Sequence, residues 1–153
     1  MKFQSSVDIN LPPDRTAALY NDPRHYKEWQ DGFVSYTQIS GEPRTIGAKA
    51  KVLFAHGKRR MELLETIQVM DLPVEINALY EHEHMVNTMI IKFSELPGQK
   101  TRITTGIGYV RFVGIIPKIM SLLMSGMYKK QNQKWLDRFK QFAESSPLEI
   151  SHS

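Results

Sequence analysis

The sequence contains no cysteine. This absence excludes disulfide bonds, thiolate zinc sites and cysteine nucleophiles, and it favours a cytoplasmic location. There is also no apolar run long enough to span a bilayer, because the longest, at 115–128, is interrupted by Pro117 and Lys118. The first residues lack the apolar stretch of a signal peptide, so we expect none.

What is present is the composition of a globular domain. The chain has 153 residues, of which 41% are hydrophobic and 24% are charged, and its formal net charge is +4. A chain of this length can bury about two-thirds of the surface that its unfolded form exposes. Because we find no repeat or linker, we predict one domain over residues 1–145 and a polar tail at 146–153.

The N-terminal part predicts a strand followed by two short helices. Residues 2–10 partly alternate between polar and apolar side chains, as in an edge strand. Prolines at the start of 11–22 suit the first turn of a helix, and the pair Asp22 and Pro23 suits the start of a second one.

From residue 33 to residue 112, apolar side chains alternate instead of recurring every three or four positions. Short turns rich in glycine and proline separate the runs, so we predict a meander of about six antiparallel strands. Period-two alternation places these residues on the inner face: Ala48, Ala50, Val52, Phe54, Met61, Leu63, Glu65, Ile67, Val74, Ile76, Ala78, Tyr80, His82, Met89, Ile91, Phe93, Ile103, Thr105, Ile107 and Tyr109.

Residues 113–145 return to helical periodicity and predict one helix of about 45 Å. A single sheet with one apolar face needs a cover, and this helix is the only predicted element long enough to provide it. The sequence therefore predicts an α+β fold in which a curved seven-stranded antiparallel sheet wraps around the C-terminal helix. Both tryptophans, Trp29 and Trp135, are expected in the core.

Small side chains on the inner face would fill the space under the helix poorly, so we expect a cavity lined mainly by apolar groups. Its predicted entrance lies between the start of the helix and the loops near 82–86 and 32–45, with Gly114 and Pro117 as a gate. The predicted ligand-contacting residues are Val52, Phe54, Met61, Leu63, Glu65, Ala78, Tyr80, His82, Met89, Ile91, Ile107, Tyr109, Met120, Leu123, Met124 and Met127.

Several stretches resemble a known superfamily. They are "DPRHYKEWQ" at 22–30, "GAKAKVLF" at 47–54, "ETIQVMDLP" at 65–73, "KTRITTGIGYVRFVG" at 100–114 and "WLDRFKQFAE" at 135–144. Together they resemble the START-related superfamily, SRPBCC, in its polyketide cyclase/dehydratase-like or Coq10-like branch. The resemblance implies the helix-grip fold, but because one fold hosts many activities, it implies no single function.

Two functions are consistent with these features. The favoured hypothesis is binding or transport of a small hydrophobic ligand, such as a lipid, an isoprenoid or quinone, or an aromatic polycycle, without a cofactor. The alternative is a cyclase/dehydratase-type enzyme, in which ionisable groups in the same cavity move protons. The acid–base candidates for that reaction are Glu65, Tyr80, His82 and Tyr109.

The stretch "LYEHEHMV" at 79–86 raises the question of a metal site. Metal ligation needs three or four converging donors, and two alternating histidines supply only part of such a set. Glu65 could be a third donor, but a hairpin turn at 70–73 would place Glu65 opposite Ala78 and too far from His82. We therefore expect no metal, and interpret His82 as either a hydrogen-bonded wall residue or a polar anchor for the ligand.

The inward position expected for Glu65 leaves three interpretations open. An inward carboxylate is costly unless it is paired, so Glu65 forms an ion pair, with Arg111 as one partner, or points outward in another register, or serves in function.

The basic turn at 56–60 and the lysines of the last helix are expected to form a solvated surface, with contact to an anionic membrane as the weaker alternative. We expect no nucleic-acid binding, because the basic residues are not interleaved with exposed aromatics.

Overall fold

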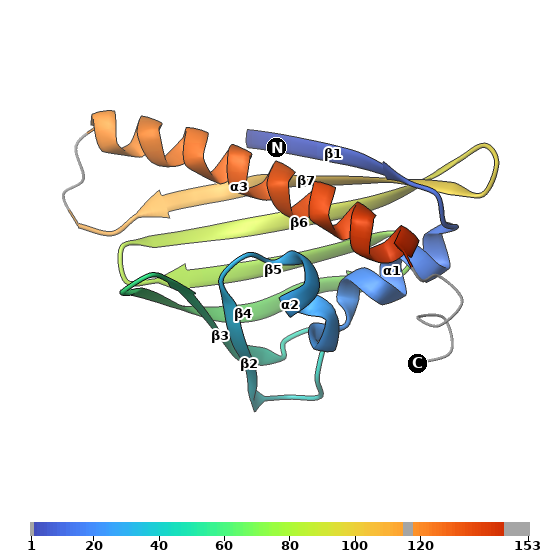
Figure 1. Cartoon of the computed structure of the whole chain (residues 1–153). Coiled ribbons are helices and arrows are strands. Elements are labelled where there is room, and N and C mark those ends of the chain that lie inside the picture. Colours follow the sequence, from blue (N-terminus) through green and yellow to red (C-terminus); the bar gives the residue numbers. More distant parts are fainter. Residues whose placement is uncertain (1, 115–117, 146–153) are drawn as a thin grey trace.

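A computed structural model of the chain describes the backbone of residues 2–114 and 118–145, with side chains from 4 to 114 and from 126 to 145 (Figure 1). In chain order the elements are β1 (Lys2–Ile9), α1 (Pro13–Asn21), the 3₁₀ turn η1 (Pro23–His25), α2 (Tyr26–Trp29), β2 (Phe33–Ser40), β3 (Lys49–His56), β4 (Arg59–Asp71), β5 (Glu75–His82), β6 (Met85–Leu96), β7 (Lys100–Phe112) and α3 (Lys118–Ser145).

The strands form one seven-stranded antiparallel sheet in the order β1-β7-β6-β5-β4-β3-β2. Short turns join β2 through β7 as a meander, while β1 returns to pair with β7 at the edge. The predicted α+β architecture, with its strand count, is therefore confirmed. Every strand but the two edge strands β1 and β2 pairs on both sides, which satisfies its backbone groups.

The sheet curls around α3, so that opposite flanks of the helix meet opposite sides of the sheet. On one flank, Lys140 Nζ donates to the Asp8 carbonyl of β1 at 2.6 Å, and Gln133 Nε2 donates to the Ser6 carbonyl at 3.1 Å. On the other flank, the Trp135 ring stacks on Phe54 of β3, with centroids 5.4 Å apart. The helix therefore lies across the concave face, which turns the inner side chains of the strands toward it.

The main hydrophobic core lies under the C-terminal half of α3. Figure 1 shows α1 and α2 beside this half of the helix, and rings from all three helices meet there. Trp29 contacts Phe139 at 5.3 Å between ring centroids, and Ile9 and Ile103 beneath them are fully buried. We call this region, marked by Ile9, Trp29, Ile103 and Phe139, the core end.

The terminal helix begins later than its sequence periodicity predicts. The amide of Val113 donates to the His84 carbonyl at 2.9 Å, which extends the ladder of β7, and Gly114 follows with φ +85°. These two residues are therefore not helical, and α3 begins at Lys118. The predicted gate residue Pro117 and the predicted tail at 146–153 lie outside the described residues. Within the described chain, no helix is long and apolar enough to cross a membrane.

Candidate ligand-binding site

The concave face brings most of the predicted lining residues together. In the strand register, Val52 lies opposite Leu63, and Phe54 lies opposite Met61. Ala78 pairs with Met89, which in turn pairs with Ile107. The residues that share this face as predicted are Val52, Phe54, Met61, Leu63, Glu65, Ala78, Tyr80, His82, Met89, Ile91 and Ile107.

Burial along this face is uneven, because Glu65, Met85 and Asn87 are buried while other inward side chains stay partly exposed. Ile91 and Ile107 are buried, whereas Met61, Leu63 and Tyr80 are only partly buried although they face inward. We call the part of the concave face formed by Glu65, Tyr80, Asn87 and Val110, and extending to the 83–84 turn, the Glu65 end. Small-molecule sites are concave and mostly apolar, so the partly exposed apolar side chains on this face provide surface that a ligand could cover.

Tyr109 does not lie on this face, so that part of the prediction is wrong. A β-bulge adds one residue to β7, because Met89 pairs with Ile107 but Asn87 pairs with Val110. The Tyr109 amide donates to Thr88 Oγ1 at 2.8 Å within the bulge, and the Tyr109 side chain is 52% exposed. Beyond a bulge the two faces exchange, so Val110 and Phe112 point inward instead.

Met127 is also misplaced in the prediction, since it is 69% exposed. It precedes the buried Leu136 by nine residues, or about two and a half helical turns, which puts it on the opposite side of α3. The inner stripe of the helix consists of Asn132, Leu136, Phe139 and Ala143. The predicted contacts Met120, Leu123 and Met124 lie outside the described side chains.

Glu65 is the centre of a buried hydrogen-bond network and is only 2% exposed. Its Oε1 accepts hydrogen bonds from Tyr36 Oη at 2.6 Å and from Arg44 at 2.7 Å, and its Oε2 accepts one from Tyr80 Oη at 2.6 Å. Three donors, one of them charged, compensate for the loss of hydration of this carboxylate. We call Glu65, Arg44, Tyr36 and Tyr80 the Glu65 network.

Arg44 reaches this network from the loop between β2 and β3. Its Nε donates to Asn21 Oδ1 at 2.9 Å, and its side chain is 13% exposed. Its backbone has φ +61°, a left-handed conformation that costs a non-glycine residue about 1–2 kcal/mol. The ion pair with Glu65 offsets this conformational cost. Because the cation beside Glu65 is Arg44, the predicted partner Arg111 is wrong. Arg111 lies beyond the bulge and is exposed.

The register explains why Tyr80 joins the network. Glu65 pairs with Tyr80 and not with Ala78 as predicted, because the turn lies at 72–74, later in the chain than predicted. One extra residue in β4 between Ile67 and Val69 then makes the partner Tyr80 instead of Glu81. Directly opposed residues on one face have Cβ atoms about 5 Å apart, which brings a tyrosine hydroxyl within reach of a carboxylate.

Burial and the neighbouring carboxylate hold the tyrosine protons in place. Desolvation first, and then the charge of Glu65, raise the pKa of Tyr36 to about 12. The same two causes, in the same order, raise the pKa of Tyr80 well above its ordinary value. Both hydroxyls are therefore fixed as donors toward Glu65 at neutral pH, and the network is a rigid group with no net charge.

His82 and His84 form no metal site. His82 is partly buried, and its Nδ1 accepts a hydrogen bond from the His84 amide at 3.3 Å. Burial first, and then the charge of His84, lower the pKa of His82. The described residues contain no group of three or more potential ligands that could hold a metal ion. His84 is exposed in the turn, where Glu83 is 3.8 Å from its Nε2.

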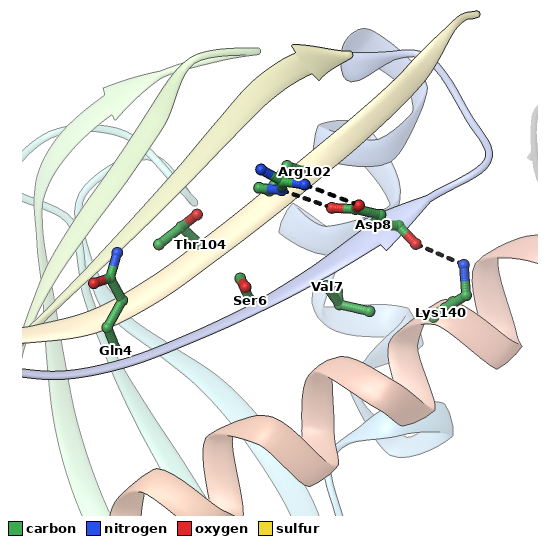
Figure 2. Close-up of a pocket in the computed structure, with 7 residues that line it drawn as sticks. All are labelled: Gln4, Ser6, Val7, Asp8, Arg102, Thr104 and Lys140. Atoms are coloured by element: carbon green, nitrogen blue, oxygen red, sulfur yellow. Dashed lines mark hydrogen bonds and ion pairs between the residues drawn. The ribbon is translucent and has the colours of Figure 1, made fainter. Parts of the chain in front are cut away.

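A polar hollow of about 500 Å³ lies along the outer side of β1 and β7 (Figure 2). Figure 2 shows Asp8 bound to Arg102 across it, and Lys140 approaching from α3. Because its charges are already paired, this hollow does not provide the apolar lining predicted for the cavity. It is lined by Gln4, Ser6, Val7, Asp8, Arg102, Thr104 and Lys140.

Part of the basic surface on α3 is also paired. Lys134 and Arg138 approach Asp31 at 3.0 and 3.5 Å, and Lys140 lies 2.9 Å from Glu144. These pairs favour the interpretation of this helix face as a solvated surface.

Comparisons with solved structures identify the fold. An aromatase/cyclase, Zhui, from Streptomyces sp. R1128 aligns with a TM-score of 0.75 at 11% identity, covering 94% of this chain and 93% of that chain. A START superfamily protein from Mycobacterium smegmatis aligns with a TM-score of 0.72 at 10% identity, covering 91% and 97%. The fold is the helix-grip fold. Ara h 8.0201 aligns with a TM-score of 0.70 at 13% identity over 94% and 97%.

The helix-grip assignment confirms, at the level of fold, the resemblance to the START-related superfamily. No protein-family model matches the sequence, and the search of curated proteins found no match. Identities this low establish the shared fold, while function has to be argued from the residues of this chain.

Sequence reasoning missed several residues of the site. Arg44 lies in a loop, where no periodicity points to an inward side chain, and Tyr36 lies on β2, whose exposed Val34 and Ile39 obscure the alternation. A buried Glu65 without a known partner was the one signal available, because it requires a nearby cation.

Proposed function

We propose that this protein binds a small hydrophobic ligand between the concave face of the sheet and α3. The observation that carries the proposal is a buried, fully hydrogen-bonded Glu65 network set among apolar residues that remain partly exposed. A monomer has little reason to keep Met61 and Leu63 inward but incompletely covered unless another molecule covers them.

The charge balance of the network favours a neutral ligand. The carboxylate of Glu65 and the guanidinium of Arg44 lie 2.7 Å apart and cancel each other. Three of the roughly four acceptor positions of the carboxylate are occupied, so it offers little to a second cation. A lipid, an isoprenoid or quinone, or an aromatic polycycle provides the apolar body, and Tyr80 Oη can still accept a hydrogen bond from it.

The fold supports the proposal without naming the ligand. One similar structure is described as an aromatase/cyclase, and another as a START superfamily protein. The location in the cytoplasm and the weak contact with an anionic membrane stay predictions.

Fluorene, a neutral tricyclic hydrocarbon, is a suitable probe for this proposal. We expect saturable one-to-one binding by fluorescence titration, and native mass spectrometry of gently purified protein to show an apolar molecule bound. Leu63→Trp, which fills the concave side, should weaken binding at least tenfold. Leu64→Trp, on the outer face of the same strand, is the matched control and should not. Absence of both a co-purified molecule and fluorene binding would refute the proposal.

A second candidate, the cyclase/dehydratase-type enzyme, is favoured by the contact between Glu65 and Tyr80 at 2.6 Å. Two of the four predicted acid–base residues therefore meet, whereas Tyr109 faces outward and His82 has no hydrogen bond to either of them. The test is deuterium exchange at the α-carbon of 2-tetralone, followed by NMR. Exchange that is accelerated by the protein and lost in Glu65→Gln would favour the enzyme, and exchange at the buffer rate would exclude this pair as a base.

A further inference from the structure

Two buried polar groups on facing inner surfaces have no hydrogen-bond partner. Asn132 Nδ2, on the inner stripe of α3, and Thr105 Oγ1, on the concave face of β7, are both unpaired. The two residues are 9% and 2% exposed. Most buried polar groups in native proteins are paired, so two unpaired ones in the same region call for a physical explanation.

The strand register and one hydrogen bond place these groups close to each other. Thr105 lies directly opposite Ser5 of the edge strand β1. Ser5 Oγ donates to the carbonyl of Lys129 at 3.4 Å, and Asn132 follows Lys129 by about one turn of α3. Asn132 and Thr105 therefore border the same space, where α3 passes over β7.

Among the described residues, the side chains next to these two groups are apolar except for Ser5, whose hydroxyl is bound to the Lys129 carbonyl. Along the concave face, Thr105 lies beside the apolar Ile91, and Asn132 precedes the apolar Leu136 on its stripe. The oxygens of Glu65, the nearest carboxylate on this face, already accept three hydrogen bonds four strands away from β1. Within the described part of the chain, both groups are therefore left without an acceptor, since an amide N–H₂ can only donate and a hydroxyl can also donate.

We propose that Asn132 and Thr105 form a subsite that binds the carbonyl oxygen of an apolar ketone. A carbonyl oxygen has two lone pairs, so it can accept from Asn132 Nδ2 and Thr105 Oγ1 at once, and it brings no charge into an apolar region. The inference rests on the proposed function, because it assigns the polar end of the ligand bound under α3. It adds a chemical class, an aromatic or aliphatic ketone, and a direction, with the carbonyl oxygen toward the β1–β7 side.

Fluorenone and fluorene test this subsite, because they share a tricyclic shape and differ in one carbonyl group. Two recovered hydrogen bonds should make fluorenone bind about tenfold more tightly than fluorene to the wild-type protein. The infrared carbonyl stretch of bound fluorenone should lie at a lower wavenumber than that of fluorenone in hexane.

Variants assign the preference to the two residues. Asn132→Leu and Thr105→Val should each remove most of the preference for fluorenone, so that the ratio of fluorenone affinity to fluorene affinity falls toward one. The matched control is Gln141→Leu, which removes an exposed amide from the same helix and should keep the preference. Thr105→Val changes the side-chain shape very little, so it is expected to fold. It can therefore test the subsite even if Asn132→Leu does not fold.

The outcomes separate the two proposals. Equal binding of fluorene and fluorenone to the wild type, or a preference that survives both variants, would overturn the ketone subsite while the hydrophobic site stands. If neither compound binds, the proposed function fails and the subsite fails with it.

Discussion

At the core end, Ile103 of β7 is fully buried in the cluster that includes Phe139, whereas at the Glu65 end Phe112 of the same strand is only partly buried. One strand therefore takes part in two kinds of packing. The core end is closed by α1 and α2, whose Tyr20 and Trp29 rings contact Phe139 at 5.3 Å between centroids. At the Glu65 end the same two helices contribute a hydrogen bond from Arg44 Nε to Asn21 Oδ1 at 2.9 Å and a contact between the Tyr26 and Tyr36 rings at 5.8 Å between centroids.

The two ends also differ in how polarity is handled. The core end buries apolar side chains, which stabilise the fold by about 25 cal/mol for each Å² of apolar surface removed from water. The Glu65 end buries an ion pair, whose desolvation offsets much of its attraction. This difference indicates that the core end provides most of the stability, and it is consistent with the binding function proposed for the Glu65 end.

The largest effect that distinguishes the ends is expected from Phe139→Ala. Removing a fully buried phenylalanine leaves a cavity and should lower the free energy of unfolding by about 3–5 kcal/mol. Phe112→Ala is the matched control, and its cost should be less than half as large because Phe112 is already partly exposed. Urea unfolding followed by tryptophan fluorescence measures both, and equal losses would show that the two ends are equally packed.

Breaking the Glu65 network should rank next. Glu65→Leu leaves Arg44 largely buried beside no carboxylate, and the loss of a buried pair member costs about 3 kcal/mol. In the double variant Glu65→Leu/Arg44→Met, most of that loss should be recovered, because no unpaired charge remains.

A double-mutant cycle by urea unfolding gives the coupling between the two residues. If the losses in the free energy of unfolding of the two single variants add up to that of the double variant, the two residues are not coupled and the ion pair makes no energetic contribution. Arg44→Gly is an informative addition, since glycine adopts φ +61° without strain but supplies no guanidinium.

Sequence reasoning succeeded where one regular period continues without interruption. The alternation of Ala48, Ala50, Val52 and Phe54 predicted a buried face, and the structure confirms it. The same reasoning placed Glu65 inside, because period two fixes its face together with Met61 and Leu63.

It failed where a single residue interrupts the period. The extra residue in β7 turned Tyr109 outward. In β4 the turn lies later in the chain than predicted, which moved the partner of Glu65 from Ala78 to Tyr80, although one extra residue in β4 shifts the register back by one. A bulge leaves no compositional mark strong enough to be read from one sequence, although Gly108 gives a partial signal. A Cβ at Gly108 would lie 2.7 Å from Ile90 Cδ1 and 2.9 Å from Thr88 Oγ1, so a larger residue there would force these side chains to shift.

Tyr80→Phe should give an intermediate effect. It removes one hydrogen bond to the charged Glu65, and such bonds contribute about 1.5–3 kcal/mol. The expected loss lies toward the lower value, because Tyr36 and Arg44 still donate to the carboxylate. Thermal unfolding checks it, with Tyr109→Phe as the control, since the Tyr109 ring is exposed and should be replaced at almost no cost. A loss for Tyr80→Phe as small as that of the control would mean that the network tolerates a missing donor.

The smallest effect concerns pH and the 83–84 turn. Because burial lowers the pKa of His82, the folded protein binds a proton at this ring less readily than the unfolded chain does. Stability should therefore fall as pH drops through the usual histidine pKa of about 6.5, and level off below the lower folded pKa. Protonation also removes the lone pair of Nδ1 that accepts from the His84 amide, so the turn at the Glu65 end should loosen first. Hydrogen exchange at the His84 amide between pH 7.5 and 5.5 measures this, and His82→Gln should reduce its pH dependence while His56→Gln, at an exposed position, should not. Equal pH dependence of exchange in all three proteins, after correction for the intrinsic rate, would mean that His82 does not control this turn.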